Sequence, residues 1–256
     1  SPAATDIYVF VANPDRNTIT RVNVFSHAVD TTDVGSNPTS VITTPDYATA
    51  VVFNEDDDTV SIIDAGTMDQ DVVSIRPNFN TMVMSHDGAW VALWYLSALE
   101  EGEVGGGGVQ SFNEVSFVNV ATGEHHPMAV GPNPSQVIFT KDDATALVVS
   151  DESLAVVDMA AETLLPEMVT IAEDLLNPPI AEEVVLSPDG SYAFVRQFGE
   201  TTVALVDLFS HEVSRIEAGG NPTDLDLTPD GTAAVIVARD ARELWIYDAV
   251  DPYTTP

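Results

Sequence analysis

Short apolar runs separated by polar turns repeat along the whole chain. Residues 50–53 (AVVF) and 192–195 (YAFV) are rich in β-branched and aromatic residues, and Gly, Pro, Asn and Asp lie between such runs. This composition predicts short strands joined by tight turns. No segment sustains the period of about 3.6 residues that marks an amphipathic helix beyond a few turns, so we expect few helices.

One phrase returns with small changes and divides the chain into units. It reads GSNPTSVITTPD at 35–46, GPNPSQVIFTKD at 131–142 and GGNPTDLDLTPD at 219–230. An apolar strand, a polar loop, a second strand such as 59–64 (TVSIID), a turn and a third strand follow each turn. Four strands in about 40 residues is the spacing of a propeller blade. We therefore predict an all-β fold, a β-propeller of four-stranded blades. The turn aspartates, spaced 41, 55, 47 and 41 residues apart, are Asp46, Asp87, Asp142, Asp189 and Asp230.

Counting strands gives six blades, of which the first and the last are incomplete. The chain begins with a second-type strand at Ile7, and its last strand ends near Asp248 as a third-type strand. The first blade should therefore lack its inner strand and the last blade its outer strand. Unpaired edges invite association. We expect a single propeller domain over residues 1–256 that continues past Pro256 as part of a seven-bladed ring; the alternative is a second chain that completes the sheets.

Several motifs resemble one known group of repeats. Residues 187–190 (SPDG) and 228–231 (TPDG) match its Ser/Thr-Pro-Asp-Gly turn, and residues 7–13 (IYVFVAN) match its strand that ends in asparagine. In these features the chain resembles the YVTN-type repeats of bacterial and archaeal surface β-propellers. The resemblance covers nearly the whole chain and implies a cell-surface or secreted module. We accordingly expect an extracellular, cell-surface or periplasmic location, and residues 1–5 (SPAAT) suit the start of a mature exported chain.

The charge of the chain excludes some partners. Eight Lys and Arg oppose 41 Asp and Glu, which gives a formal net charge of −33. Such a field repels nucleic acid and anionic membrane surfaces, so we expect no nucleic-acid partner. No apolar run approaches the roughly 20 residues of a membrane span, so we expect no membrane insertion. The acids are spread over all units, which favours adaptation to saline surroundings over cation binding, and the absence of cysteine leaves no disulfide framework.

Polar residues share one position of the predicted inner strands and should surround one mouth of the central channel. Two residues beyond the last of them, Asp226 stands where the sister strands have Ile or Val. Alternation places Asp224 and Asp226 on one face of their strand. An acid at a crowded apolar position needs an arginine, a water or a cation as partner. The candidate binding residues at this mouth are Ser40, Thr81, Gln136, Glu183, Asp224 and Asp226.

Two insertions depart from the repeat. Residues 97–110 lengthen a loop between the second and third strands of the third blade, close to an unusual density of aromatic residues. Residues 171–180 lengthen the loop into the inner strand of the fifth blade. In propellers these two loop types emerge on the same face, so we expect both insertions on one rim, where departures from a repeat tend to carry function. The candidate binding residues of this rim are Trp94, Tyr95, Glu100, Glu101, Glu103 and Asn177.

The signals for metal ions are weak. His27 and His211 occupy equivalent phrases, FSHAV and FSHEV, and are interpreted as turn residues of different blades. The acidic loop 54–58 lacks the ligand spacing and the glycine of an EF-hand. No metal site is assigned and no cofactor is required; calcium is the one ion that the acids would admit. Its weak candidate ligands are Asp56, Asp58, Asp224 and Asp226.

We expect a non-enzymatic exported propeller that acts as a protein-interaction or assembly module through its rim. The partner would be another protein or a second copy of the chain. One alternative is a calcium-dependent hydrolase or lactonase-like enzyme with Glu183, Asp224 and Asp226 at the channel mouth. No nucleophile motif supports it, and no catalytic residue is assigned. The other alternative is a structural subunit of a surface layer or filament.

Overall fold

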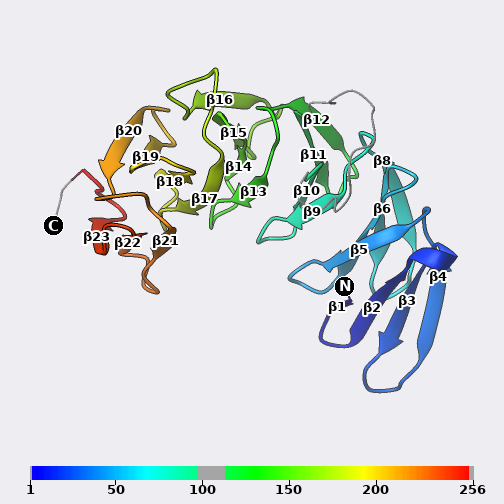
Figure 1. Cartoon of the computed structure of the whole chain (residues 1–256). Helices are drawn as coiled ribbons and strands as arrows, with labels where there is room; N and C mark the ends of the chain where they lie inside the picture. Colours follow the sequence, from blue (N-terminus) through cyan, green and yellow to red (C-terminus); the bar gives the residue numbers. More distant parts are fainter. Residues whose placement is uncertain (1, 97–112, 254–256) are drawn as a thin grey trace. The chain divides into compact units, whose positions relative to one another are not determined.

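The fold is all-β and is built from sheets that follow one another along the chain (Figure 1). The computed structural model describes residues 2–96 and 113–253. In these residues the strands form six antiparallel sheets, five of four strands and a last one of three. The same residues contain no helix with the length and apolarity of a bilayer span. The predicted all-β class and its four-stranded repeat are confirmed.

The chain divides into two compact units, one of residues 1–107 and 114–128 and the other of residues 108–113 and 129–256. A single domain over residues 1–256 therefore stays a prediction. The elements of the first three sheets are β1 (Ala3–Ala4), β2 (Tyr8–Asn13), the 3-10 turn η1 (Pro14–Arg16), β3 (Thr18–Asn23), β4 (Val29–Asp33), β5 (Pro38–Thr43), β6 (Thr49–Asn54), β7 (Thr59–Asp64), β8 (Gln70–Ser74), β9 (Thr81–Met84), β10 (Trp90–Trp94), β11 (Glu114–Asn119) and β12 (His125–Ala129).

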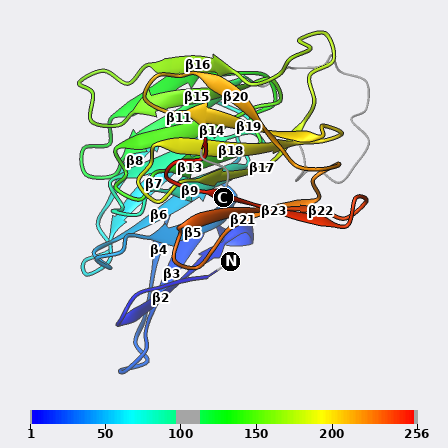
Figure 2. The same ribbon diagram turned by 90° about the vertical axis from the view of Figure 1, so that its left-hand side faces the viewer.

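The second unit holds the last three sheets. Figure 2 shows β18, β19 and β20 of the fifth sheet running alongside one another, as their pairing requires. Every sheet is a meander in which consecutive strands pair. The strands are β13 (Gln136–Phe139), β14 (Thr145–Val149), β15 (Ser153–Asp158), β16 (Pro166–Thr170), β17 (Ala181–Leu186), β18 (Tyr192–Gln197), β19 (Thr202–Asp207), β20 (Val213–Glu217), β21 (Asp224–Leu227), β22 (Ala233–Ala238) and β23 (Glu243–Asp248).

The first sheet corrects one sequence-based prediction. We expected the first blade to lack its inner strand, but β1 pairs with β2 through Ala3 opposite Phe10 and Ala4 opposite Val9. The strand was missed because two alanines carry no β-branched or aromatic signal. The prediction for the other end is confirmed in the described residues, where the last sheet consists of β21, β22 and β23.

The recurring turn aspartate has a structural role. Thr44 Oγ1 donates to Asp46 Oδ1 at 2.6 Å, and the same Oδ1 accepts the Ala48 amide at 3.0 Å. The Thr49 amide then donates to Thr44 Oγ1 at 3.0 Å. These bonds, the Thr44 hydroxyl first, lower the pKa of Asp46 below its ordinary value. The same hydroxyl–carboxylate bond, at 2.7 Å, recurs in the pairs Ser85–Asp87, Thr140–Asp142, Ser187–Asp189 and Thr228–Asp230.

A second recurring turn, which we call the outer hairpin, joins the third and fourth strands. An Asp or Asn ends the third strand and accepts backbone amides, as Asp64 Oδ1 does from Gly66 and Thr67. In the first, second, third and fifth sheets the residue four positions later adopts a positive φ, and its amide donates to the carbonyl of that Asp or Asn at 2.9 Å. The predicted turn role of the two histidines is thereby confirmed. The residues at this fourth position are His27, Met68, Gly123 and His211, with φ of 59°, 67°, 70° and 60°.

The asparagine takes the left-handed conformation in the first two copies of the repeated phrase. Asn37 and Asn133 have φ of 53° and 50°, and Asn78 has φ of 67° in the third unit. Asn is among the few residues that tolerate this region without a glycine. The third unit therefore has the same turn, although its sequence there, RPNF, lacks the Gly-x-Asn-Pro pattern of the phrase.

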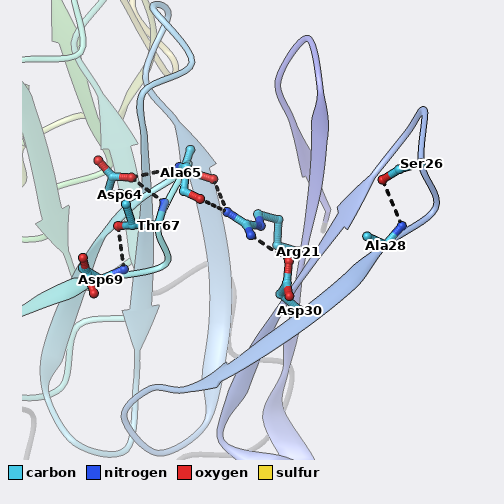
Figure 3. A network of polar contacts seen from close by, with 9 residues as sticks. Arg21, Ser26, Ala28, Asp30, Asp64, Ala65, Thr67 and Asp69 are labelled. Atoms are coloured by element: carbon cyan, nitrogen blue, oxygen red, sulfur yellow. Dashed lines mark hydrogen bonds and ion pairs between the residues drawn. The ribbon is translucent and has the colours of Figure 1, made fainter.

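Apolar residues of adjacent sheets pack together within each unit. Phe10 and Ile19 of the first sheet pack with Val41, Ala50 and Val52 of the second. The Arg21 side chain, 11% exposed, reinforces this contact: it donates to the carbonyls of Ala65 and Gly66 at 2.7 and 2.5 Å and to Asp30 at 2.7 Å (Figure 3). Its guanidinium also lies 4.6 Å from the centre of the Tyr8 ring. The mostly buried guanidinium of Arg21 thus joins the first two sheets.

Candidate interaction surface

The predicted polar ring residues do occupy one repeat position. Each pairs with the residue seven places after its turn aspartate, and the pairs are Ser40–Phe53, Thr81–Trp94, Gln136–Val149, Glu183–Arg196 and Asp224–Val237. Their equivalence is therefore confirmed. Ser40 and Thr81 belong to the first compact unit and the others to the second. Their gathering at one channel mouth stays a prediction.

Glu183 is held by an ion-pair network between the fifth and sixth sheets. Its Oε2 accepts Arg196 Nε at 3.0 Å and the Leu225 amide at 2.9 Å. Arg196, whose side chain is 13% exposed, also pairs with Glu182 and donates to the Pro222 carbonyl at 3.3 Å. Arg196 stands where sister strands have Phe53, Trp94 or Val149. The Glu183 carboxylate thus links the fifth and sixth sheets, a structural role that our sequence analysis missed.

Asp226 does not meet the environment that the sequence suggested. We expected an acid at a crowded position in need of a partner, but Asp226 is exposed and accepts the amide of its neighbour Leu227 at 2.8 Å. Asp224 is exposed as well, whereas Leu225 between them is 1% exposed. The alternation of faces is therefore confirmed: Leu225 packs in the apolar cluster that the fifth and sixth sheets share, and Asp224 and Asp226 take the opposite face.

The aromatic residues near the first insertion are not a free surface. Trp94 is 5% exposed at the end of β10, so its predicted role in binding a partner is corrected. Tyr95 is half-buried and packs against the apolar cluster of the second and third sheets. These residues were misassigned because sequence density says nothing about which face of a strand a side chain takes. Glu100, Glu101 and Glu103 lie outside the described residues.

The acids proposed as weak calcium ligands are used by neighbouring turns. Asp56 Oδ1 accepts the side-chain amide of Asn37 at 3.1 Å, and Asp58 Oδ1 accepts the backbone amide of Asn78 at 3.0 Å. Between them, Asp57 Oδ2 accepts the amide of Ser36 at 2.6 Å. In the described part of the chain, no three His, Cys, Asp or Glu side chains come together in a group that could hold a metal ion.

The second insertion, residues 171–180, is anchored at its base. Arg215 on β20 donates to the Ile171 carbonyl and, at 2.7 Å, to Gln197 Oε1, and its Nε lies 3.2 Å from Glu173 Oε1. The Arg215 side chain is 18% exposed and Gln197 is fully buried. At the other end of the loop, the Phe198 amide donates to the Ile180 carbonyl at 2.8 Å. The insertion is therefore a fixed part of the second unit at both ends.

The anchored loop carries an apolar surface on its outside. Leu175 is 59% exposed, Leu176 90% and Ile180 57%, and Phe198, bonded to Ile180, is 65% exposed. We call these four residues the loop patch. Asn177, a predicted rim residue, is exposed beside it and contacts Asp174 Oδ2 at 3.4 Å. Several large apolar side chains exposed on one loop and its flanking residue mark an interaction site more often than a single exposed one does.

Our sequence analysis missed both the Arg215 contacts that hold the base of the insertion and the loop patch, for different reasons. Arg196 and Arg215 are two of only eight basic residues, so each basic residue in this chain was a signal worth following. The patch residues are ordinary apolar residues, and only the structure separates them from the core. The insertion itself was found because it breaks the repeat.

Comparisons with known proteins show the fold alone. No protein-family model matches the sequence, and no curated protein matches it. The solved structure of Kuenenia stuttgartiensis hydrazine synthase is similar at 17% identity with a TM-score of 0.51, over 97% of this chain and 76% of that one. The dihydro-heme d1 dehydrogenase NirN is similar at 15% identity with a TM-score of 0.61, over 98% of this chain and 55% of that one.

A third similar structure is the β-propeller domain of Cps50 (Swd1) from Myceliophteria thermophila, at 14% identity and a TM-score of 0.50, over 82% of this chain and 65% of that one. These likenesses cover between 82% and 98% of this chain, and they include enzymes as well as a β-propeller domain. The chain therefore has the β-propeller fold, represented here by five four-stranded sheets and one three-stranded sheet. This fold is shared by many functions, so the function must be argued from the surface.

Proposed function

We propose that this chain is a non-enzymatic propeller module that binds a protein partner through the loop patch. The observation that carries the proposal is the exposure of Leu175, Leu176, Ile180 and Phe198 on a loop whose base is fixed by Arg215. An apolar surface that faces water on a fixed frame loses little conformational freedom when it binds. Burying one Leu or Phe side chain contributes about 2 kcal/mol.

The surroundings of the patch suggest the chemistry of the partner. Glu173 and Asp174 precede the apolar residues, and both are exposed. A chain of net charge −33 repels acidic proteins and attracts basic ones. The partner surface that fits best is an apolar centre with basic residues at its rim.

The resemblance to YVTN-type repeats supports a finer proposal about context. The turns at 187–190 and 228–231 have the sequence of those repeats, and the structure gives both the same hydrogen-bonded turn. We propose that the chain is an exported module of this kind that works at or outside the cell surface. The high acidity and the lack of cysteine are compatible with that setting.

A peptide-display experiment tests the binding proposal. A random peptide library would be selected on the wild-type protein, with the double variant Leu176→Ser/Phe198→Ser used for counter-selection. Phe209→Ser is the matched control, because Phe209 is 96% exposed in an outer hairpin outside the loop patch. We expect peptides rich in apolar and basic residues whose Kd rises about tenfold or more on the double variant and is unchanged on the control. Peptides that bind all three proteins equally would refute the proposal.

A further inference from the structure

Two prolines fix the backbone in the last part of the second insertion. Asn177, Pro178, Pro179 and Ile180 lie between the turn at Asp174 and the start of β17, and they belong to no strand. Proline holds its own φ at about −65° and keeps the residue before it out of the helical region. The described residues contain no cis peptide bond. The chain from Asn177 to Pro179 is therefore extended in the manner of polyproline II.

Both ends of this segment are held in place. Before it, Asp174 Oδ1 accepts the Leu176 amide at 2.9 Å. After it, the Ile180 carbonyl accepts the Phe198 amide at 2.8 Å. A segment that is ordered before it binds loses little conformational entropy when a partner takes it up.

The backbone of the segment offers hydrogen-bond acceptors with few donors. Within the part of the chain that the structure describes, no hydrogen bond reaches the carbonyl oxygens of residues 175–179. Pro178 and Pro179 have no amide hydrogen, so they could not pair with an incoming β-strand. The indole N–H of a tryptophan or the hydroxyl of a tyrosine, in contrast, can donate to carbonyls of this kind.

Apolar side chains lie on both sides of the proline pair in the sequence. Leu176 precedes the pair and is 90% exposed, and Ile180 follows it and is 57% exposed. Pro178 and Pro179 are half-buried, so part of each ring faces solvent. Grooves lined by aromatic rings bind polyproline II segments in this way, through apolar contact and a backbone that is already ordered. An aromatic groove therefore fits the segment better than an added strand does.

Acidic residues mark one end of the segment. Glu173 and Asp174 precede the apolar residues, and both are exposed. A groove that takes the segment should hold an arginine or a lysine beside Asp174. Because the acids stand only before the prolines and not directly after them, this contact would also set the direction in which the segment enters the groove.

We propose that residues 174–180 are a polyproline II ligand, which a partner protein takes into a groove lined by Trp and Tyr with a basic residue beside Asp174. This inference rests on the proposed function and specifies the partner of the loop patch. The proline pair, the unpaired carbonyls and the apolar residues on both sides carry it together.

Selection of a displayed WW-domain library on the full chain tests the proposal. All positions of the domain's groove, its Tyr and Trp included, would be randomised. We expect the selected domains to carry Trp or Tyr again in the groove and Arg or Lys at its rim. Pro178→Ala/Pro179→Ala should raise their Kd about tenfold or more. Pro14→Ala is the matched control, because Pro14 is an exposed proline outside the loop patch, and it should leave the Kd unchanged.

A charge variant tests the orientation of the segment. Asp174→Asn retains an oxygen that can accept the Leu176 amide and removes only the negative charge. It should raise the Kd of the selected domains severalfold, and this loss should disappear when the basic residue at the rim of the groove is replaced by Gln. Equal losses with and without that basic residue would overturn the predicted contact at Asp174.

The outcomes separate this inference from the proposed function. If Leu176→Ser weakens binding and the double proline variant does not, the polyproline II ligand is overturned and the loop patch remains an interaction surface. If no domain binds the wild type, or if the selected domains tolerate all of these variants, the inference is overturned as well. The peptide selection on the loop patch then decides the proposed function by itself.

Discussion

Replacing Arg215 with Met should loosen the insertion that carries the loop patch. Arg215 bonds to three groups that are distant from it in sequence: the Ile171 carbonyl, the Glu173 carboxylate and Gln197 Oε1. Met keeps much of the apolar stem and removes the guanidinium. The change therefore isolates the polar contacts of the anchor from its packing.

The expected loss of stability follows from burial. Gln197 is fully buried, and its Nε2 has no hydrogen-bond partner among the described residues. Removal of Arg215 would leave Oε1 without a donor as well, at a cost of about 2–3 kcal/mol for a buried group bonded to a charge. Glu173 is 75% exposed, so its ion pair adds well under about 1 kcal/mol. We expect a total loss of about 3 kcal/mol.

Urea unfolding of the variants, with native-state hydrogen exchange of β18 to β20, measures this loss. The double variant Arg215→Met/Gln197→Met removes both buried polar partners and should recover at least about 1 kcal/mol relative to Arg215→Met alone. Limited proteolysis within residues 172–180 should be faster in Arg215→Met. A loss below about 1 kcal/mol, or strictly additive effects of the two substitutions, would refute the reasoning.

Three further predictions concern other parts of the chain. Arg21→Ala should lower the free energy of unfolding by about 3 kcal/mol. Asp30→Asn should lower it by less than about 1 kcal/mol, because Asp30 is 55% exposed. Urea unfolding in which Asp30→Asn is the more damaging change would contradict the role of Arg21 in joining the first two sheets. Hydrogen bonds lower the pKa of Asp46 in the folded state, so its carboxylate stabilises the fold above the unfolded pKa of 3.8, and this stabilisation is lost as the pH falls through the folded-state pKa. The free energy of unfolding of Asp46→Asn should therefore depend less on pH below about 4 than that of the wild type. Parallel pH profiles of the two proteins would count against this. Millimolar calcium should change the Tm of the wild type and of Asp58→Asn by the same amount, since Asp58 already accepts the Asn78 amide; a rise confined to the wild type would restore the calcium hypothesis.

The sequence by itself determined the repeating part of this protein. Strands, turns and their order depend on residues close together in the chain, so the repeated phrase and its aspartates were enough to predict four-stranded sheets. The turn role of His27 and His211 was also local, because equivalent phrases fold into equivalent hairpins. Where the local signal was too short, as in β1, the prediction failed.

Only the tertiary structure decided which side chains meet and which face water. Arg215 and Ile171 are 44 residues apart, as are Arg21 and Ala65, and no local pattern specifies such contacts. Trp94 was expected on a surface and is buried, while Asp226 was expected in a crowded site and is exposed. The physical reason is that burial depends on which sheet covers a face. Alternation along a strand assigns a residue to a face, but the packing of neighbouring sheets decides whether that face is core or surface.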